Sequence, residues 1–195
     1  MDPARRTPRA KSRPAPLNAQ RLEELALAYV ARFATSAARL RDYCHRKLRE
    51  RGWEGAEVGA EPPEVAALVA RFVALGYVDD LGFARMRSGA LLRRGYGERR
   101  VEQALRGAGI GEDERAAVRT GPRAARAAAV AFARRRRLGP FAAVVTTDPG
   151  ERARQCNAML RAGHTLDNAR ALLNAGTEAE AAAWADACED ENDLA

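Results

Sequence analysis

Aromatic residues are scarce in this 195-residue chain: Phe, Trp and Tyr make up 6% of it, although hydrophobic residues reach 47%. Much of the apolar content is alanine, a small residue with the highest helix propensity. A thick β-sandwich would need more Val, Ile and Tyr in its core. The composition therefore favours short, closely packed helices, and its apolar content argues against wholesale disorder.

Cysteine pairs and long apolar runs are also lacking. Cys44, Cys156 and Cys188 are odd in number, far apart and outside any CxxC spacing. We expect them to be reduced thiols of a cytoplasmic protein. No stretch approaches the 18 apolar residues of a membrane-spanning helix, and no apolar segment of a secretion signal follows the basic N-terminus. Neither secretion nor a membrane partner is expected.

Patterns for catalysis or metal binding are missing. The chain has three serines and two histidines, and none of the motifs GxxxxGK[ST], HExxH or GxSxG. The GAGIG stretch at 107–111 follows a predicted helix and reads as its stop signal. Asp79 and Asp80 could suggest a metal site, but an N-cap at the start of a helix explains these two residues more simply. We therefore expect no enzyme activity, no cofactor, no metal and no small-molecule substrate.

Charge is unevenly spread along the chain, whose net charge is +7. Residues 1–16 hold five basic groups and one acid, residues 178–195 hold seven acids and no base, and residues 17–177 carry +10. Such a basic body favours a nucleic acid, an acidic protein surface or anionic lipid as partner. Lys11 and Lys47 are the only lysines, so GC-rich coding, which inflates both arginine and alanine, is an alternative source of part of the arginine excess.

Helix signals follow one another along the chain, and no convincing strand appears. Asn18 and Ser36 are predicted N-caps of the first two helices. Pro62 or Pro63 suits the first turn of a third, which Gly76 ends. The remaining helices are predicted from Asp79 or Asp80 to Arg94, from the Gly-Tyr-Gly turn to GAGIG, over 112–120, from Pro122 to the RRRR run, from Asp148–Pro149 to Ala162, from Thr165 to Ala175, and from a capping box of Thr177 and Glu180.

One helix–turn–helix segment recurs without a gap. LRRGYGERRVEQAL at 92–105 aligns with LRAGHTLDNARALL at 160–173, and Cys44, Leu48 and Gly52 align less specifically with Val101, Leu105 and Gly109. Gly95 and Gly163 are therefore expected at left-handed helix ends, where a side chain is costly. His164 occupies the position of Tyr96, so we expect it to pack in a turn. Chance similarity among Ala-, Arg- and Leu-rich helices is the alternative.

Units this small need neighbours to cover their apolar faces. The sequence thus predicts an all-α fold of tandem three-helix repeats that form an elongated, curved array. The predicted segments are a disordered basic tail at 1–16, repeats at 17–78, 79–121 and 122–176, and an acidic, partly helical tail at 177–195.

Arginine is the residue type with a functional pattern. Arginines surround the turn of the second repeat and end the long helix of the third repeat. Stacking of successive repeats could bring these arginines together in one basic strip. Such a strip would suit a phosphate backbone or an acidic protein groove. The candidate residues for binding a partner or DNA are Arg93, Arg94, Arg99, Arg100, Arg106, Arg134, Arg135, Arg136, Arg137 and Arg161.

Five segments carry a family resemblance by their order and spacing. They read AYVARFATSAARLRDYCHRKL, LGYVDDLGFARMR, LLRRGYGERRVEQALRGAGI, RRRRLGPF and MLRAGHTLDNARALL. In this order they resemble the RecX family of regulatory proteins over roughly residues 22–175. The chain departs from the family pattern at His164, where an aromatic residue is more usual, and in its acidic tail.

The resemblance implies a non-enzymatic modulator of the RecA recombinase, built from three-helix repeats. Such a protein binds RecA and its nucleoprotein filament and restrains strand exchange and ATP hydrolysis, with DNA as a further candidate partner. Two other classes compete with this interpretation. One is a helical nucleic-acid-binding module without a recombinase partner, and the least favoured is an enzyme that uses only Asp, Glu and Arg.

Overall fold

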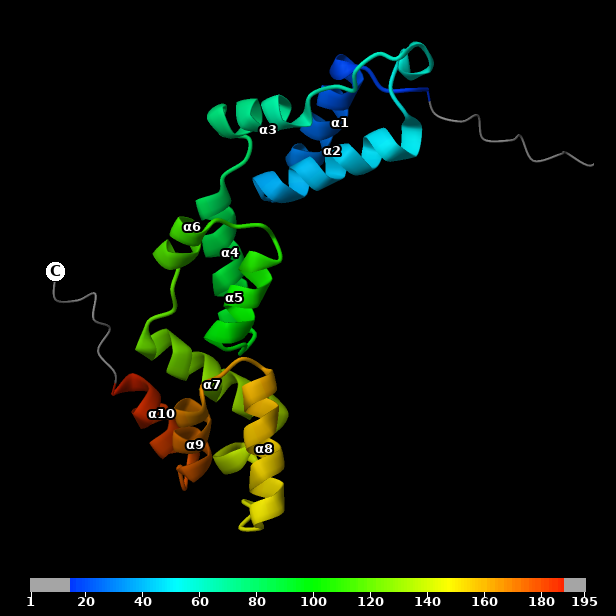
Figure 1. The fold of residues 1–195 in the computed structure, drawn as a ribbon. Helices are drawn as coiled ribbons and strands as arrows, with labels where there is room; N and C mark the ends of the chain where they lie inside the picture. The colour runs from blue at the N-terminus through cyan, green and yellow to red at the C-terminus, as the bar shows by residue number, and fades with distance from the viewer. Residues whose placement is uncertain (1–14, 188–195) are drawn as a thin grey trace, which may run out of the picture. The chain divides into compact units, whose positions relative to one another are not determined.

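The computed structural model describes residues 15–187, so most of the predicted basic tail, Cys188 and the last acidic residues lie outside it. All regular elements within these residues are helical, apart from an isolated bridge between Leu17 and Trp53. The predicted all-α fold is confirmed for this part of the chain. The helices fall into two compact units, Met1–Val78 and Asp79–Ala195 (Figure 1).

The first unit holds three α-helices, whose starts follow from local capping. Asn18 accepts a hydrogen bond from the Arg21 N–H, and Ser36 accepts one from the Arg39 N–H, so both predicted N-caps are confirmed. Gly52 ends the second helix with a positive φ of +74°. The elements are α1 (Ala19–Arg32), α2 (Ala37–Arg51), the 3₁₀ turn η1 (Ala56–Val58) and α3 (Val65–Ala74).

The third helix begins later than the prolines suggested. It starts at Val65, with Glu64 as an N-cap whose side chain makes no capping bond. A residue that precedes proline is pushed out of the α region, so Pro62 cannot easily be helical before Pro63. The placement of Pro62 or Pro63 in the first turn is therefore wrong. The predicted end is confirmed, because Gly76 adopts φ +73° after the C-cap.

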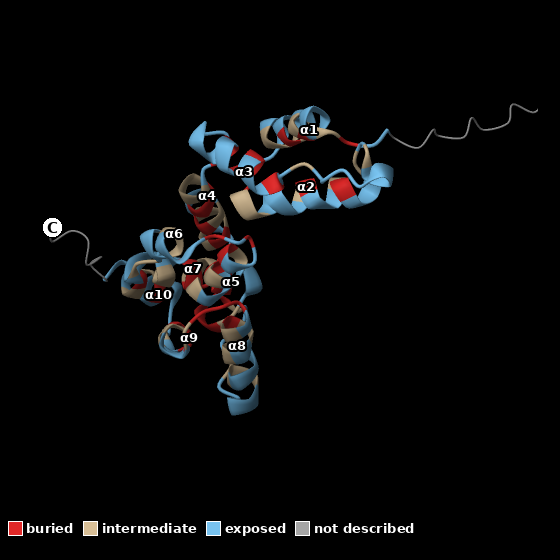
Figure 2. Ribbon diagram, turned by 45° about the horizontal axis from the view of Figure 1, so that its top comes forward, coloured by how far each residue is buried: buried red, intermediate tan, exposed pale blue. Residues whose placement is uncertain are grey.

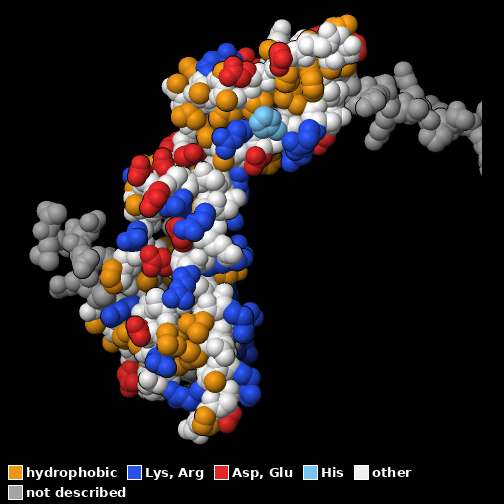
Figure 3. All heavy atoms as spheres, in the orientation of Figure 1, with side chains coloured by type: hydrophobic (Ala, Val, Ile, Leu, Met, Phe, Trp, Pro, Cys, Tyr) orange, Lys and Arg blue, Asp and Glu red, His pale blue; other side chains and the backbone are white. Residues whose placement is uncertain are grey.

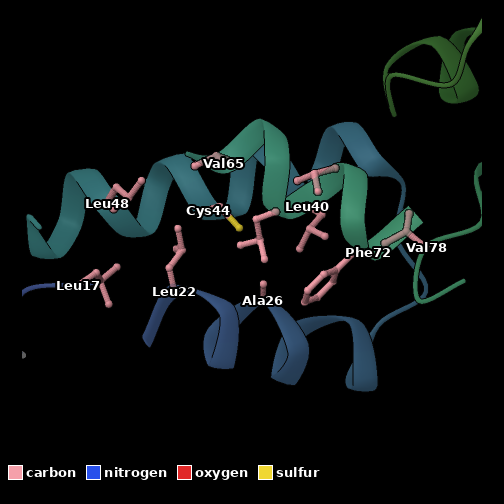
Figure 4. Close-up of a cluster of buried hydrophobic side chains, with 11 residues drawn as sticks. Leu17, Leu22, Ala26, Leu40, Cys44, Leu48, Val65, Phe72 and Val78 are labelled. Carbon is pink, nitrogen blue, oxygen red and sulfur yellow. The ribbon is translucent and has the colours of Figure 1, made fainter. Parts of the chain in front are cut away.

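Side chains from all three helices fill the core of the first unit (Figure 4). Leu22 and Ala26 of α1 face Leu40 and Cys44 of α2, and Phe72 of α3 lies near one end of the cluster, with Val78 beyond it. Burial raises the pKa of the Cys44 thiol to about 11. Cys44 thus acts as a small apolar core residue, as expected.

The second unit holds seven α-helices within the described residues. Asp79, Asp148 and Thr165 each accept the predicted N-terminal capping bond, and Pro122 and Pro149 open their helices. The elements are α4 (Asp80–Arg93), α5 (Glu98–Arg106), α6 (Glu112–Ala117), α7 (Pro122–Arg136), the 3₁₀ turn η2 (Gly139–Phe141), α8 (Pro149–Arg161), α9 (Leu166–Asn174) and α10 (Glu178–Asp186).

The last helix, α10, lies against α7. The Arg126 guanidinium donates to the Trp184 carbonyl at 2.9 Å and lies 5.1 Å from its ring centroid. Thr177 caps α10 as predicted, but the capping box differs in one bond. The Glu180 carboxylate accepts from the Gly176 N–H at 2.7 Å, one residue before the expected donor. The segment from 178 to 186 is therefore a packed helix.

Two clusters of buried side chains stabilise the second unit. One joins α4, α5 and the α5–α6 connection, and the other joins α7, η2, α8, α9 and α10. Figure 2 shows the buried residues in red on the inward faces of these helices. Tyr96, in the turn between α4 and α5, packs against both clusters. The turn that recurs in the sequence thus lies where the two clusters meet.

Candidate partner-binding groove

Two glycine turns position the candidate site. Gly95 follows α4 with φ +76° and Gly163 follows α8 with φ +98°, so both occupy the left-handed region that favours glycine. A Cβ atom on Gly95 would lie 2.6 Å from the Phe132 backbone nitrogen, and one on Gly163 would lie 2.5 Å from that of Arg100. The predicted left-handed glycines are confirmed, and each also allows close contact with another helix.

The two turns contact each other directly. The Gly97 N–H donates to the Ala162 carbonyl at 3.0 Å, and the Arg99 N–H donates to the Gly163 carbonyl at 3.2 Å. A Cβ atom on Gly97 would lie only 2.4 Å from the Gly163 carbonyl carbon and oxygen. The segments that match in sequence are therefore packing partners in the structure.

His164 completes this contact. Its side chain is 2% exposed, and its Nε2 atom lies 3.1 Å from the Gly95 carbonyl oxygen. Because a carbonyl only accepts, Nε2 carries the proton and donates it. Burial lowers the pKa of His164, and the bond to Gly95 offsets part of that effect. The prediction that His164 packs in a turn is confirmed.

Four of the ten candidate arginines line one groove in the second unit. Arg94 is the C-cap of α4, Arg135 and Arg136 end α7, and Arg161 ends α8. The groove has a volume of about 500 Å³, and Tyr96, Phe132, Ala158 and Ala162 complete its lining. We call this feature the arginine groove. Arg94 lies next to Gly95 in the first turn, and Arg161 lies just before the second turn. The contact between the two turns therefore brings both arginines to the groove.

Aromatic rings hold three of the four guanidinium groups. Arg94 and Arg135 lie over the Tyr96 ring, 5.7 and 5.8 Å from its centroid. Arg135 and Arg136 also lie over Phe132, at 5.8 and 6.0 Å. Cation–π contacts of this kind limit side-chain freedom without neutralising the charge. The groove thus presents partly ordered cations.

The arginine groove lacks compensating acids. No carboxylate lines it, and within residues 15–187 none lies within 4.0 Å of its four guanidinium groups. All four side chains are exposed, and Figure 3 shows basic side chains gathered along one edge of this unit. Such a site is suited to an anionic group from another molecule.

The other six candidate arginines are exposed but lie outside the groove. Arg106 pairs with Glu102 at 2.9 Å, and Arg134 lies 3.8 Å from Glu178 and over the Phe141 ring. Arg137 ends α7 with a left-handed φ of 55°. The remaining three are Arg93, Arg99 and Arg100.

Tyr96 and Phe132 are the site residues that the sequence reasoning missed. Phe132 precedes Arg135 and Arg136 by three and four residues, the spacing that places side chains on one face of a helix. That spacing could have identified the contact with the arginines. The contact of Tyr96 with Arg135 has no comparable local signal, because it joins the α4–α5 turn to α7.

Neither a metal site nor a membrane-spanning helix is found among the described residues. Among residues 15–187, no group of three or more His, Cys, Asp or Glu side chains is placed to hold a metal ion. None of the helices there is long and apolar enough to cross a membrane. The arginine groove is therefore the feature with the clearest binding chemistry.

Comparison with known proteins defines the family. No family model matches the chain. The chain is 31% identical over 183 residues to the "Regulatory protein RecX" of Myxococcus xanthus (strain DK1622), and the match covers 89% of this chain and 98% of that protein. The sequence match and the helical fold thus define a regulatory protein rather than an enzyme. The chain belongs to the RecX family.

Proposed function

We propose that this chain is a cytoplasmic protein that binds RecA and its nucleoprotein filament and inhibits recombinase activity and ATP hydrolysis. In this way it would modulate recombination and DNA repair. Membership of the RecX family is the observation that carries the proposal. The arginine groove supports it, because it offers four exposed cations without a neighbouring carboxylate to neutralise them.

Electrostatics assist the encounter. The charge of +10 on residues 17–177 attracts the chain to a filament rich in phosphate and speeds association. Long-range attraction does not by itself choose a partner, so direct contacts must supply the specificity. We propose that the groove makes the main contact and that Arg93, Arg99, Arg100 and Arg106 of α4 and α5 make additional ones.

A helical DNA-binding module is the second candidate function, and the same basic charge favours it. Such a module would bind DNA without any recombinase. Its affinity would fall linearly in log salt, with a slope of about −0.7 per phosphate contact on single strands and about −0.9 on duplex. It would not bind RecA when DNA is absent.

A pull-down with purified RecA separates the two functions. The full chain is immobilised and mixed with RecA after nuclease treatment, and in parallel with RecA and a single-stranded oligonucleotide. The regulator retains RecA in both mixtures. Retention only when DNA is present would favour the DNA-binding module.

A further inference from the structure

We propose that the arginine groove binds a carboxylate-rich polypeptide segment of the partner protein that also carries apolar side chains. This inference rests on the proposed function and identifies the chemistry of the contact. It selects a protein segment over a nucleic acid strand as the ligand of this groove. Three features of the groove support that choice.

The first feature is the apolar floor. Phe132 and Ala162 are buried, Tyr96 and Ala158 are half-buried, and the four arginines surround them. A segment in which carboxylates alternate with aliphatic or aromatic residues would satisfy both parts of the groove. Guanidinium groups bind carboxylates in bidentate pairs, and the apolar side chains cover the floor. A phosphate backbone would add no apolar contact to the half-buried Tyr96 and Ala158.

The second feature is that no aromatic ring in the groove is free for a base. Guanidinium groups already lie over the Tyr96 and Phe132 rings, at centroid distances of 5.7 to 6.0 Å. Binding of single strands by basic channels usually gains much of its energy from bases stacked on exposed aromatic side chains. A base would have to displace an arginine here, so a strand would gain phosphate contacts alone.

The third feature is the charge of the neighbouring surface. Glu178 of α10 lies 3.8 Å from Arg134, the residue that precedes the two groove arginines of α7. Glu180 and Asp186 extend the acidic surface along α10. A long polyanion that continued past Arg134 would meet these carboxylates. A short acidic segment confined to a groove of about 500 Å³ avoids them.

Fluorescence anisotropy with the full chain tests the proposal. The probes are a labelled peptide of alternating Glu and Leu, a peptide of the same length and charge with Ser in place of Leu, and a thymidine oligonucleotide. We expect the Glu–Leu peptide to bind most tightly, and the oligonucleotide to leave it bound at matched charge concentration. Equal binding of the two peptides, or displacement by the oligonucleotide, would overturn the proposal.

Two independent charge reversals locate the binding site. R135E/R136E changes the groove arginines of α7 and R94E/R161E changes those beside the two glycine turns, and each is expected to weaken Glu–Leu peptide binding about tenfold or more. R85E/R170E is the matched control, because both residues are exposed in the same unit and lie outside the groove. It should change binding less than about twofold. Circular dichroism establishes that each variant is folded, and unchanged peptide binding by a folded groove variant would overturn the proposal.

The same variants in the RecA pull-down separate this inference from the proposed function. Loss of RecA retention by both groove variants, with retention by the control, supports the inference. Retention by the wild type and by both groove variants would overturn the groove's role and leave the proposed function standing. If the wild type itself retains no RecA, the proposed function fails, and so does the assignment of a RecA segment as the ligand.

Discussion

His164 donates a hydrogen bond to the Gly95 carbonyl across 3.1 Å, although 69 residues separate them in the chain. Gly95 belongs to the turn at 94–97, and His164 belongs to the matching turn at 162–165. This contact joins the end of α4 to the end of α8. It therefore helps to set the distance between Arg94 and Arg161, which both line the arginine groove.

Gly97→Ala is expected to destabilise the second unit by about 2 kcal/mol or more. The added methyl group would lie 2.4 Å from the Gly163 carbonyl, so the two turns would have to separate. Gly97 has a negative φ of −80°, and the loss is therefore steric rather than conformational. Urea unfolding monitored by circular dichroism measures the change.

Gly150→Ala is the matched control for that substitution. Gly150 lies in the first turn of α8, and its nearest neighbour to a Cβ atom is 3.4 Å away. Alanine there should be neutral or stabilising by up to about 1 kcal/mol. If Gly97→Ala and Gly150→Ala unfold at the same urea concentration, the two turns do not pack as described.

Stability should fall as the pH drops below 6.5, the ordinary pKa of histidine. The unfolded chain takes up a proton at His164 in that range, whereas the buried imidazole, with its lowered pKa, does not. The contribution of His164 to the free energy of unfolding is fully present above pH 6.5. It decreases as the pH falls toward the pKa of His164 in the folded state, by at most about 1.4 kcal/mol per pH unit. Urea unfolding between pH 7.5 and 5.5 follows it.

The difference between the wild type and His164→Gln isolates the effect of His164 from that of other charged groups, which include the neighbouring Glu98. Glutamine keeps an N–H donor for the Gly95 carbonyl but does not titrate. His45→Gln removes the chain's other histidine and should keep the wild-type slope. If the pH dependence disappears in the His45→Gln variant instead, the proton uptake does not belong to His164.

Cys44 should be protected from thiol reagents in the folded chain. Its side chain is buried and its pKa is raised to about 11, so very little reactive thiolate exists at pH 8. In a Cys156→Ser/Cys188→Ser variant, labelling of the remaining thiol followed by absorbance should be slow without urea and fast after unfolding. Rapid labelling of the native variant would mean that the first unit opens readily.

The four consecutive arginines of α7 should differ in their effect on RecA binding. R135E/R136E alters the groove, whereas R134E/R137E alters a residue paired with Glu178 and a helix C-cap. We expect the first pair to weaken RecA retention about tenfold and the second pair much less. Titration of RecA over immobilised variants gives the affinities. Equal losses would indicate general attraction by charge.

Local features of the fold were readable from the sequence because short-range chemistry determines them. Asn18, Ser36 and Thr165 cap helices through bonds to residues three positions later. Gly95 and Gly163 were recognisable as left-handed because they repeat in one pattern. The start of α3 was missed because two adjacent prolines restrict each other, an effect that single-residue preferences do not contain.

The arginine groove could not be predicted in the same way. Its walls come from α4, α7 and α8, and only the tertiary packing of their ends brings them together. The repeat indicated that the two turns were alike, but not that they contact each other. The sequence match pairs the α4–α5 turn with the α8–α9 turn. Helix α7 therefore lies before the matching part of the third predicted repeat. The repeat boundaries at 78, 121 and 176 stay predictions.

ATP hydrolysis by preformed RecA filaments tests the central claim most directly. The chain is added at increasing ratios to filaments on single-stranded DNA, and the assay is repeated with an excess of free DNA. The proposed function predicts that hydrolysis slows at ratios well below one chain per RecA monomer, and that free DNA restores it only in part. Inhibition that requires stoichiometric protein and is fully reversed by free DNA, with no RecA bound in its absence, would contradict the account and favour a simple DNA-binding module.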